Sequence, residues 1–335
     1  MVNWVEVLRK HLLGRIAKNA GLRQHAVAVD AAAPGTVINL WLPDHKLKPP
    51  KQNQNDPAAT NKRPAVVLVH GFAGDGMMTW AFQVGALRRQ GYDVYVPDLV
   101  HFGGSTSPSP DRSVAFQARC IAAALGKLGV ERCAAVVGFS YGGLVAFQMA
   151  AACPPGMVRS VVVSGSSLVF TGAMSDALLG RLGGGGAGTG TSSSLTELML
   201  PDSVGGLRFL FAAATHMKLW FPRRVLSDFL KVMYNNRKER AELLENMITC
   251  RDEKAPAPVF QQVHNILLLW GEDDDFFPVE GAKMLKEELG EKATLRSISR
   301  AGHLAHLERP CVYNRCLKEF LALAMHSPTS SWPEL

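Results

Sequence analysis

One serine stands in a setting that could make it a nucleophile. Ser140 lies inside the stretch GFSYG (138–142), with the apolar run 133–137 before it and the apolar run 144–150 after it. A serine hydroxyl is a weak nucleophile at neutral pH and needs a base beside it. In a G-x-S-x-G turn from strand to helix, the flanking glycines leave a strained serine exposed above the sheet. The same glycines would also suit a simple tight turn. Whether Ser140 is a nucleophile or only part of a turn therefore depends on the other candidate groups.

A second segment could supply hydrogen-bond donors for that chemistry. The stretch LVHGFAG (68–74) ends a short apolar strand, and open α/β sheets bind ligands at the carboxyl ends of their strands. Acyl transfer needs backbone N–H groups directed at the developing oxyanion, and we expect them from Phe72 and Tyr141. His70 could serve as a base, but it precedes Ser140 and lies at a strand end. A role in bracing the loop is therefore favoured for His70.

A carboxylate that orients a base is expected after a later strand. The segment LLLWGEDDDFFP (267–278) places four consecutive acids at the end of an apolar run. Neighbouring side chains in an extended loop point in different directions, and no histidine stands within a few residues, so a metal site is disfavoured. One inward-facing carboxylate is the simpler interpretation. Asp274 is the first choice, while Asp273 and Asp275 remain open because spacing does not fix the register.

Two histidines follow the last expected strand, in SRAGHLAHLERP (299–310). His303 comes directly after a glycine at the strand end, where a loop can hold its imidazole over the site. His306 lies three residues further on, where a helical turn should begin. We therefore predict His303 as the base. The chain order serine, acid, histidine is the order that this kind of site requires.

The elements around these residues predict an α/β fold. Apolar strands alternate with helices, which indicates a parallel sheet covered by helices on both faces. An antiparallel hairpin of residues 25–30 and 36–44 should precede them. The expected parallel strands are 64–71, 92–99, 133–140, 158–165, 265–271 and 293–299, and the expected helices are 77–91, 113–129, 141–153, 278–290 and 311–326.

The alternation is interrupted by an insertion. Residues 168–260 look mostly helical, with expected helical stretches at 195–200, 204–221 and 223–248. Their glycine-rich run, 183–194, lacks the GK[ST] ending of a phosphate loop and is expected to be a flexible tether. The chain therefore divides into an N-terminal amphipathic arm (1–24), an α/β core (25–167 and 261–335) and a helical cap (168–260). Apolar cap segments either pack on the core or line an apolar pocket.

Charge and composition narrow the class of protein. Residues 1–63 hold 10 Lys and Arg against 4 Asp and Glu, whereas the remaining residues hold 26 against 25. A nearly neutral body gives no support for a nucleic-acid partner. The six cysteines form no CxxC or zinc-like pattern, and there is no signal peptide or membrane-spanning run, so we expect a cytoplasmic protein.

The basic N-terminal arm allows three roles. Apolar residues at 5, 8, 12 and 16 recur at helical spacing between lysines and arginines. Such a helix could pack on the body, cover an acyl-binding mouth or lie on an anionic membrane. Packing on the body is favoured, and peripheral membrane contact through residues 1–22 is retained as a hypothesis.

These segments together resemble the α/β-hydrolase superfamily. HGF, GFSYGG, LLLWGEDDDFFP and AGHLAHLERP are similar to its oxyanion, nucleophile, acid and histidine segments, and PDLVHFGGS (97–105) resembles the loop after its next core strand. KLWFP and NRKERAELLE more narrowly resemble a plant group with a helical cap. The resemblance implies an eight-stranded, mostly parallel sheet with the cap after the sixth strand. It assigns Ser140, Asp274 and His303 to a catalytic triad and so selects Asp274 over its neighbours.

The resemblance and the residues lead to one expected activity. We expect a serine hydrolase, carboxylesterase- or lipase-like, that cleaves a small-molecule ester through an acyl-enzyme, without metal or organic cofactor. Epoxide hydrolases and dehalogenases of this superfamily use an aspartate nucleophile, which Ser140 argues against. Hydrolysis of a thioester or a carbon–carbon bond, and a receptor with little or no turnover, remain alternatives. The sequence does not address the oligomeric state.

Overall fold

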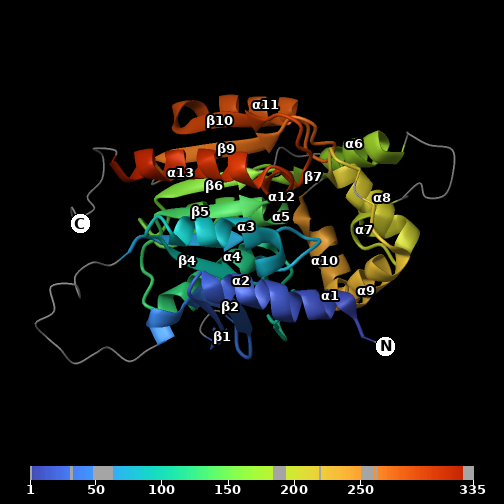
Figure 1. Cartoon of the computed structure of the whole chain (residues 1–335). Coiled ribbons are helices and arrows are strands. Elements are labelled where there is room, and N and C mark those ends of the chain that lie inside the picture. Colours follow the sequence, from blue (N-terminus) through green and yellow to red (C-terminus); the bar gives the residue numbers. More distant parts are fainter. Residues whose placement is uncertain are drawn as a thin grey trace, which may run out of the picture.

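An eight-stranded sheet forms the centre of the molecule (Figure 1). The structure is a computed structural model that describes residues 2–30, 33–47, 63–183, 194–218, 220–249, 260 and 263–326. The strand order is β1-β2-β4-β3-β5-β6-β9-β10. β2 pairs antiparallel with β1 and with β4, and the remaining neighbours pair in parallel. The strands are β1 (Leu22–Ala28), β2 (Val37–Pro43), β3 (Ala65–Val69), β4 (Asp93–Pro97), β5 (Ala135–Phe139), β6 (Ser160–Ser164), β9 (Asn265–Gly271) and β10 (Ala293–Ile298).

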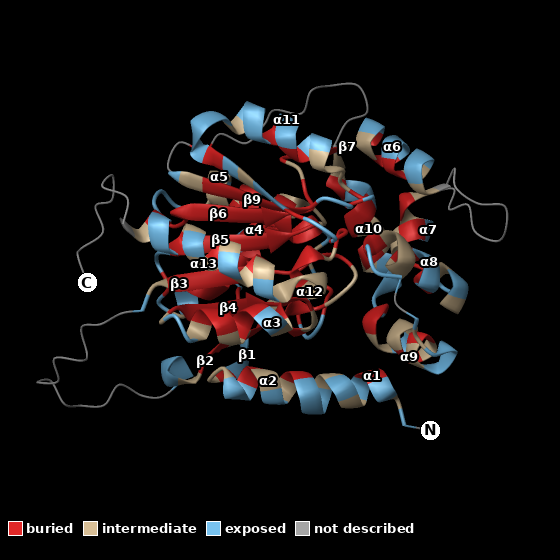
Figure 2. Ribbon diagram, turned by 45° about the horizontal axis from the view of Figure 1, so that its top comes forward, coloured by how far each residue is buried: buried red, intermediate tan, exposed pale blue. Residues whose placement is uncertain are grey.

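Helices cover both faces of this sheet, as the apolar strands predict. β3, β4, β5 and β6 are buried at every position, and Figure 2 shows exposed residues along the outer sides of the helices. The buried residues of α4 (Val114–Lys127), α5 (Tyr141–Ala152) and α11 (Val279–Leu289) pack in one core cluster. Those of α3 (Gly76–Arg88) and α13 (Pro310–His326) pack in the other. The expected α/β-hydrolase architecture is confirmed.

An insertion between β6 and β9 lies beside the carboxyl ends of the central strands (Figure 1). A short parallel pair joins its two ends, because β7 (Phe170–Thr171) pairs with β8 (Ile248–Thr249). Between them lie five helices of the described chain: α6 (Gly172–Gly183), α7 (Leu195–Met199), α8 (Val204–Ala214), α9 (Arg223–Met233) and α10 (Arg237–Met247). Of the glycine-rich run 183–194, residues 184–193 lie outside the described residues.

Two helix expectations in the insertion are wrong. The helix expected over 204–221 ends at Ala214, because the next residues turn to contact the core: Met217 donates its backbone N–H to Glu308. The helix expected over 223–248 is two helices. Asn236 between them has a φ of 50°, a left-handed conformation that asparagine tolerates better than most residues and that ends a helix.

The N-terminal arm packs on the body as a helix whose middle is π-helical. α1 (Trp4–Val7), η1 (Leu8–Leu13) and α2 (Gly14–Asn19) follow one another without a break, and together they are called the N-terminal helix here. Asn3 begins it by accepting hydrogen bonds from the N–H groups of Val5 and Glu6. The side chains of Val5, Leu13 and Ala17 are buried against the body. Packing, the favoured role of this arm, is thus observed.

The remaining elements are short. η2 (Asp44–Leu47) follows β2, η4 (Gly290–Lys292) precedes β10, and α12 (Ala305–Glu308) follows the loop after β10. None of the helices in the described ranges is long and apolar enough to cross a bilayer. The described cysteines, 120, 133, 153, 311 and 316, are free thiols, and Cys250 lies outside the described residues.

Candidate active site

Ser140 occupies a strained turn between β5 and α5. Its φ of 53° and ψ of −124° place a residue with a side chain where L-residues rarely occur. The glycines on either side are sterically required. A Cβ at Gly138 would lie 2.3 Å from the carbonyl oxygen of Gly142, and one at Gly142 would lie 2.4 Å from that of His70. The turn therefore keeps a geometry that presents the serine at the end of the strand.

Asp274 and His303 form a buried pair beside this turn. Asp274 Oδ2 lies 2.9 Å from His303 Nδ1, and Asp274 Oδ1 accepts hydrogen bonds of 2.8 Å from the N–H groups of Phe276 and Phe277. The exposed fractions of Asp274 and His303 are 4% and 6%. These contacts fix the carboxylate, which in turn orients the imidazole.

The neighbouring acids point elsewhere. Glu272, Asp273 and Asp275 are exposed. Asp273 Oδ2 pairs with Nδ1 of His216 in the insertion at 2.9 Å. Spacing alone left three aspartates open, and in the structure Asp274 is the one that contacts His303. Among the described residues, no group of three or more His, Cys, Asp or Glu side chains is placed to hold a metal ion.

Aromatic rings hold the imidazole of His303. The ring of Phe139, which precedes Ser140, has its centroid 4.8 Å from that of His303, and the stacked ring of Phe276 lies at 4.9 Å. Gly165, with a φ of 55°, leaves the room that His303 needs, because a Cβ there would lie 2.7 Å from two of its ring atoms. The turn of Ser140 and the loop 299–304, called the histidine loop because it carries His303, thus meet through Phe139.

His70 braces the loop that follows β3. Its Nδ1 lies 2.7 Å from the carbonyl oxygen of Gly71, and its Nε2 accepts the N–H of Leu99 at 2.9 Å. These partners assign the proton to Nδ1. Burial lowers the pKa of His70 to about 4, so the ring is neutral at pH 7. Both nitrogens are occupied, which is the bracing role expected for His70.

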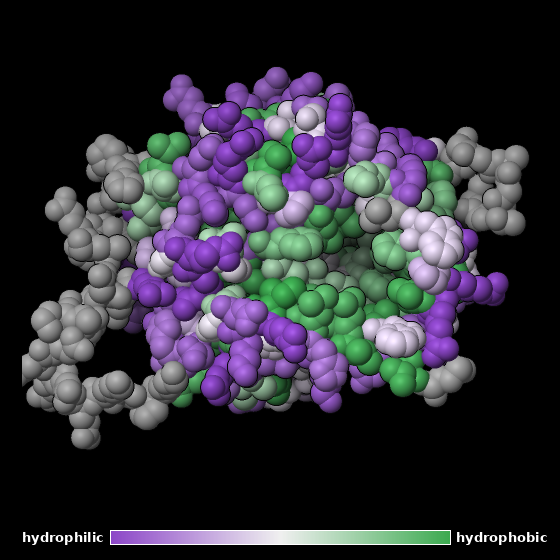
Figure 3. Space-filling view, viewed as in Figure 1, coloured by the Kyte–Doolittle hydropathy of each residue, from purple (hydrophilic) through white to green (hydrophobic). Residues whose placement is uncertain are grey.

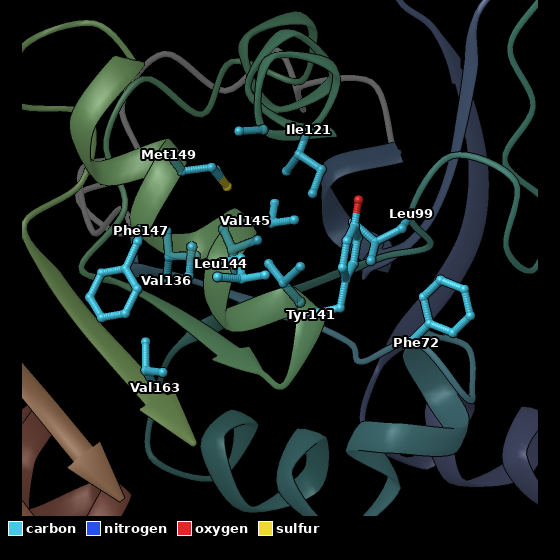
Figure 4. Packing of buried hydrophobic residues seen from close by; sticks show 14 of the residues in the cluster. Phe72, Leu99, Ile121, Val136, Tyr141, Leu144, Val145, Phe147, Met149 and Val163 are labelled. Carbon is cyan, nitrogen blue, oxygen red and sulfur yellow. The ribbon is translucent and has the colours of Figure 1, made fainter. Parts of the chain in front are cut away.

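Phe72 and Tyr141 lie next to each other at the expected oxyanion position. Their rings pack edge to face with centroids 6.0 Å apart, and Figure 4 shows both side chains directed into the buried cluster. Tyr141 is the first residue of α5, and the first N–H groups of a helix have no partner within it. The rings therefore anchor two backbone segments beside Ser140. Their use as an oxyanion hole stays a prediction.

His306 is separate from the acid. It is fully buried in α12, with its ring centroid 4.4 Å from that of Phe139 and 5.2 Å from that of Trp80. Neither ring nitrogen has a hydrogen-bond partner among the described residues. Burial, and secondarily the charge of His303, lower the pKa of His306 to about 3. His306 is therefore a neutral, space-filling ring, and the choice of His303 over it agrees with this geometry.

The sequence analysis missed Glu308. Its Oε2 accepts the N–H of Gly302, next to His303, at 2.7 Å, and its Oε1 accepts the N–H of Met217 at 3.0 Å. One carboxylate therefore fixes the histidine loop and ties it to the insertion. An acid at the end of a four-residue helix gives only a weak signal in the sequence, because both of its partners are backbone groups.

An apolar cavity of about 490 Å³ opens beside the site. Figure 3 shows it as a hollowed apolar area on this face of the molecule. Its walls come from the N-terminal helix, the segment after β3, helices α8 and α9 with their connection, and the histidine loop. Three of its lining residues, Gly71, Phe139 and Leu304, are immediate neighbours of Ser140 or His303 in space or sequence.

Comparison with known proteins identifies the family. Residues 64–310 match the family model described as the alpha/beta hydrolase fold. The chain belongs to this family. The matched range contains Ser140, Asp274 and His303, and it excludes the N-terminal helix.

Individual relatives in this family are distant or cover only part of the chain. An uncharacterized protein of Mycobacterium bovis is 41% identical over 101 residues, which are 30% of this chain and 29% of the relative. The match thus spans less than a third of that relative's length. Lipase 3 of Moraxella sp. (strain TA144) is 22% identical over 244 residues, or 72% of each protein.

The solved structures extend the likeness in fold. A membrane phospholipase A, described as a novel bacterial virulence factor, superposes with a TM-score of 0.74 at 21% identity over 96% of this chain and 93% of its own. At this identity the likeness shows the fold alone. These three relatives are bacterial, so the expected closer resemblance to a plant group is not supported, and short cap motifs were too weak a basis for it.

Proposed function

We propose that this α/β hydrolase is a serine hydrolase of carboxylic esters, with Ser140 as nucleophile, His303 as base and Asp274 as the acid that orients it. The observation that carries the proposal is the buried Asp274–His303 pair, 2.9 Å between Oδ2 and Nδ1, packed through Phe139 against the strained turn of Ser140. A serine presented in this way, with a base held by a carboxylate, is the arrangement that acyl transfer uses.

The proposed reaction has two steps. His303 Nε2 takes the proton of the Ser140 hydroxyl while Oγ bonds to the ester carbonyl carbon. The N–H groups of Phe72 and Tyr141 stabilise the oxyanion, each by about 3 kcal/mol. The carbon–oxygen bond to the alcohol then breaks, and the alcohol leaves with the proton from His303. Water, deprotonated by His303, attacks the acyl-enzyme, which releases the acid and restores Ser140.

Other reactions of the fold fit the site less well. A reaction through an enzyme aspartyl ester needs a carboxylate where this chain has Ser140. Thioester and carbon–carbon bond hydrolysis would use the same three residues, but no residue of the site favours them. An ester is preferred because the apolar cavity beside the proposed triad suits an uncharged acyl or aromatic group. Insertion helices α7–α10 are the proposed cap over that cavity.

A fluorophosphonate probe tests whether Ser140 is activated. We expect the wild-type protein to be labelled and Ser140→Ala to remain unlabelled. Ser166→Ala is the matched control and should still be labelled. Ser166 is also buried, and it lies next to Gly143 in the first turn of the helix that follows Ser140. A folded wild-type protein that is not labelled would rule out the proposed activity.

Turnover separates an enzyme from a receptor. With p-nitrophenyl esters of increasing chain length, an enzyme releases many equivalents of nitrophenol per protein, and Ser140→Ala releases none above background. A stoichiometric burst without further turnover on every ester would instead indicate a receptor on a hydrolase fold. Equal rates for wild type and Ser140→Ala would show that the site has been wrongly assigned.

A further inference from the structure

The N-terminal helix forms one wall of the apolar cavity beside the proposed triad. Val5 and Leu8 line the cavity from this helix, and Phe139 and Leu304 line it from the core. Val5 is 3% exposed, while Leu8, one turn further on, is 43% exposed and stands at the rim. This wall comes from residues 4–19, which precede the range 64–310 that matches the family model. The wall therefore lies outside the range matched by the family model.

Polar contacts hold this wall at the start of the helix and in its middle. The Trp4 N–H donates to Asp228 Oδ2 at 3.0 Å, and Asn3 Nδ2 donates to the Asp228 carbonyl, so the helix start is fixed to α9. Arg9 Nε donates to Asp75 Oδ2 at 2.9 Å. Asp75 lies four residues after Gly71, and it also caps α3 by accepting a hydrogen bond from the Met78 N–H. The helix thus bridges the proposed cap and the loop expected to hold the oxyanion.

The lining of the cavity favours an uncharged apolar chain. Most of it consists of aliphatic and phenylalanine side chains, and the phenyl rings of Phe221 and Phe229 pack on that of Phe211. Glu308, the one carboxylate in the lining, is already bound to two backbone N–H groups. His306 also lines the cavity, and its ring is neutral because burial lowers its pKa to about 3. Burial of apolar surface is therefore the main source of affinity, about 0.8 kcal/mol for each buried methylene group.

We propose that this cavity binds the long apolar acyl chain of the ester, and that the N-terminal helix limits the length of that chain through Leu8 and Val5. The inference rests on the proposed esterase function of Ser140. It adds the substrate class, a long-chain acyl ester, and names the N-terminal helix, which precedes the matched range 64–310, as the element that sets chain-length preference.

Substitution at Leu8 tests the wall in catalysis. The series is p-nitrophenyl acetate, butyrate, octanoate, dodecanoate and palmitate. Leu8→Trp should lower kcat/KM for dodecanoate and palmitate, relative to kcat/KM for acetate, by at least about 10-fold. Val5→Ala should shift the optimum toward longer chains by removing volume from the wall. The matched control is Leu12→Trp, because Leu12 is exposed on the same helix and does not line the cavity.

A binding measurement tests the same wall without hydrolysis. Ser140→Ala should bind the fluorescent fatty acid cis-parinaric acid. Adding Leu8→Trp should weaken binding by at least about 10-fold, whereas adding Leu12→Trp should not. Unchanged chain-length profiles in Leu8→Trp and Val5→Ala, together with unchanged binding when Leu8→Trp is added to Ser140→Ala, would overturn the inference. Intact, wall-dependent binding with no hydrolysis and no probe labelling would overturn the proposed activity and leave the binding site standing.

Discussion

The three aspartates after β9 differ in surroundings rather than in type. Asp274 is buried and accepts from two backbone N–H groups as well as pairing with His303, whereas Asp273 is exposed and pairs with His216. A carboxylate held by three partners can keep the imidazole in one tautomer and stabilise its charged form. The half-exposed contact between Asp273 and His216 is screened by water and contributes little.

Exchange of single carboxylates should separate these two aspartates. Asp274→Asn should lower kcat on esters by on the order of 10⁴-fold, because the amide favours the wrong tautomer of His303. Asp273→Asn, the control, should stay within a few-fold of wild type. Steady-state kinetics on p-nitrophenyl butyrate measure both, and a large loss in Asp273→Asn with a small one in Asp274→Asn would contradict the assignment.

Gly165 is predicted to matter for His303 rather than for stability alone. Gly165 and Gly156 both have positive φ, of 55° and 77°, so alanine at either position should cost about 1 kcal/mol of backbone strain. A Cβ at Gly165 meets the His303 ring at 2.7 Å, whereas one at Gly156 meets nothing within 4 Å. Gly165→Ala should therefore lose at least about 10-fold in kcat and Gly156→Ala should not. Thermal unfolding curves separate the two effects. Gly156→Ala measures the backbone strain alone, and Gly165→Ala should lower Tm further because its Cβ also meets the buried ring.

For single residues, the sequence indicates which segment carries a site residue more reliably than which residue of that segment faces the site. Ser140 could be identified as a candidate nucleophile because its glycines and the apolar runs on either side form one pattern. The choice among Asp273, Asp274 and Asp275 needed the family resemblance, since consecutive loop residues leave the inward-facing one undetermined. Glu308 was not identifiable, because its role depends on the backbone of Gly302 and of Met217, which is 91 residues away in the chain.

The N-terminal helix is held by a narrow apolar face and by polar contacts: with Asp228 at its start, with Asp75 through Arg9, and with Arg88 through the carbonyl oxygen of Ala20 at its end. Its buried residues are few, Val5, Leu13 and Ala17, and its middle is π-helical. π-Helical turns are rare and occur often at functional sites. An element with little buried surface should depend on its polar contacts for its position.

Loss of one anchor should loosen this helix measurably. Arg9→Met removes the pair with Asp75, and amide hydrogen exchange within residues 4–19 should become about 5-fold faster, which corresponds to about 1 kcal/mol for a partly exposed ion pair. Lys10→Met changes the neighbouring charge at an exposed position and should leave exchange unchanged. Equal acceleration in both variants would point to net charge instead of the anchor.

Among the elements, the strands of the core could be predicted from the sequence, whereas the helix ends of the insertion could not. Strands β3 to β6 and β9 read as apolar runs because both faces are covered, which is a local signal. The helix ends of the insertion are decided by distant partners. α8 stops where Met217 reaches Glu308, and α9 and α10 separate at the left-handed Asn236. Periodicity alone carries no information on such contacts.

The stability of the whole molecule should fall as pH is lowered, partly because of His306. Its pKa is lowered from 6.5 to about 3 in the folded state, by burial and then by the charge of His303. Between these pH values the unfolded chain binds a proton that the folded chain does not. The free energy of unfolding therefore decreases as pH falls through this window, by up to about 1.4 kcal/mol per pH unit.

Replacement of His306 isolates this contribution. His306→Phe keeps a ring among Trp80, Phe139 and Tyr313 and cannot be protonated. Urea unfolding between pH 6.5 and 4 should show a smaller loss of stability in this variant than in wild type. His264→Phe, at an exposed position, should keep the wild-type slope. An unchanged slope in His306→Phe would show that His306 does not titrate in this way.

The outer side of the N-terminal helix is the last feature of the whole molecule to be tested. Trp4, Leu8 and Leu12 follow one another at four-residue spacing and are 56%, 43% and 49% exposed. The basic residues Arg15 and Lys18 are exposed on the same helix. An apolar stripe with basic neighbours binds anionic bilayers by burial and charge together. Because Leu8 stands at the rim of the cavity, such binding would bring the cavity mouth to the lipid surface.

Vesicle sedimentation decides whether this stripe contacts membranes. The wild-type protein should sediment with phosphatidylcholine–phosphatidylglycerol vesicles, less so at high salt, since salt screens the basic residues. A double variant, Trp4→Ser with Leu12→Ser, should bind the vesicles at least about 10-fold more weakly. Both substitutions remove apolar surface that the bilayer would bury. Met284→Ser removes an apolar residue that is 65% exposed on α11 and serves as the control. Equal sedimentation of all three proteins, or none by wild type, would exclude the stripe as a membrane contact and leave the helix as a cavity wall alone.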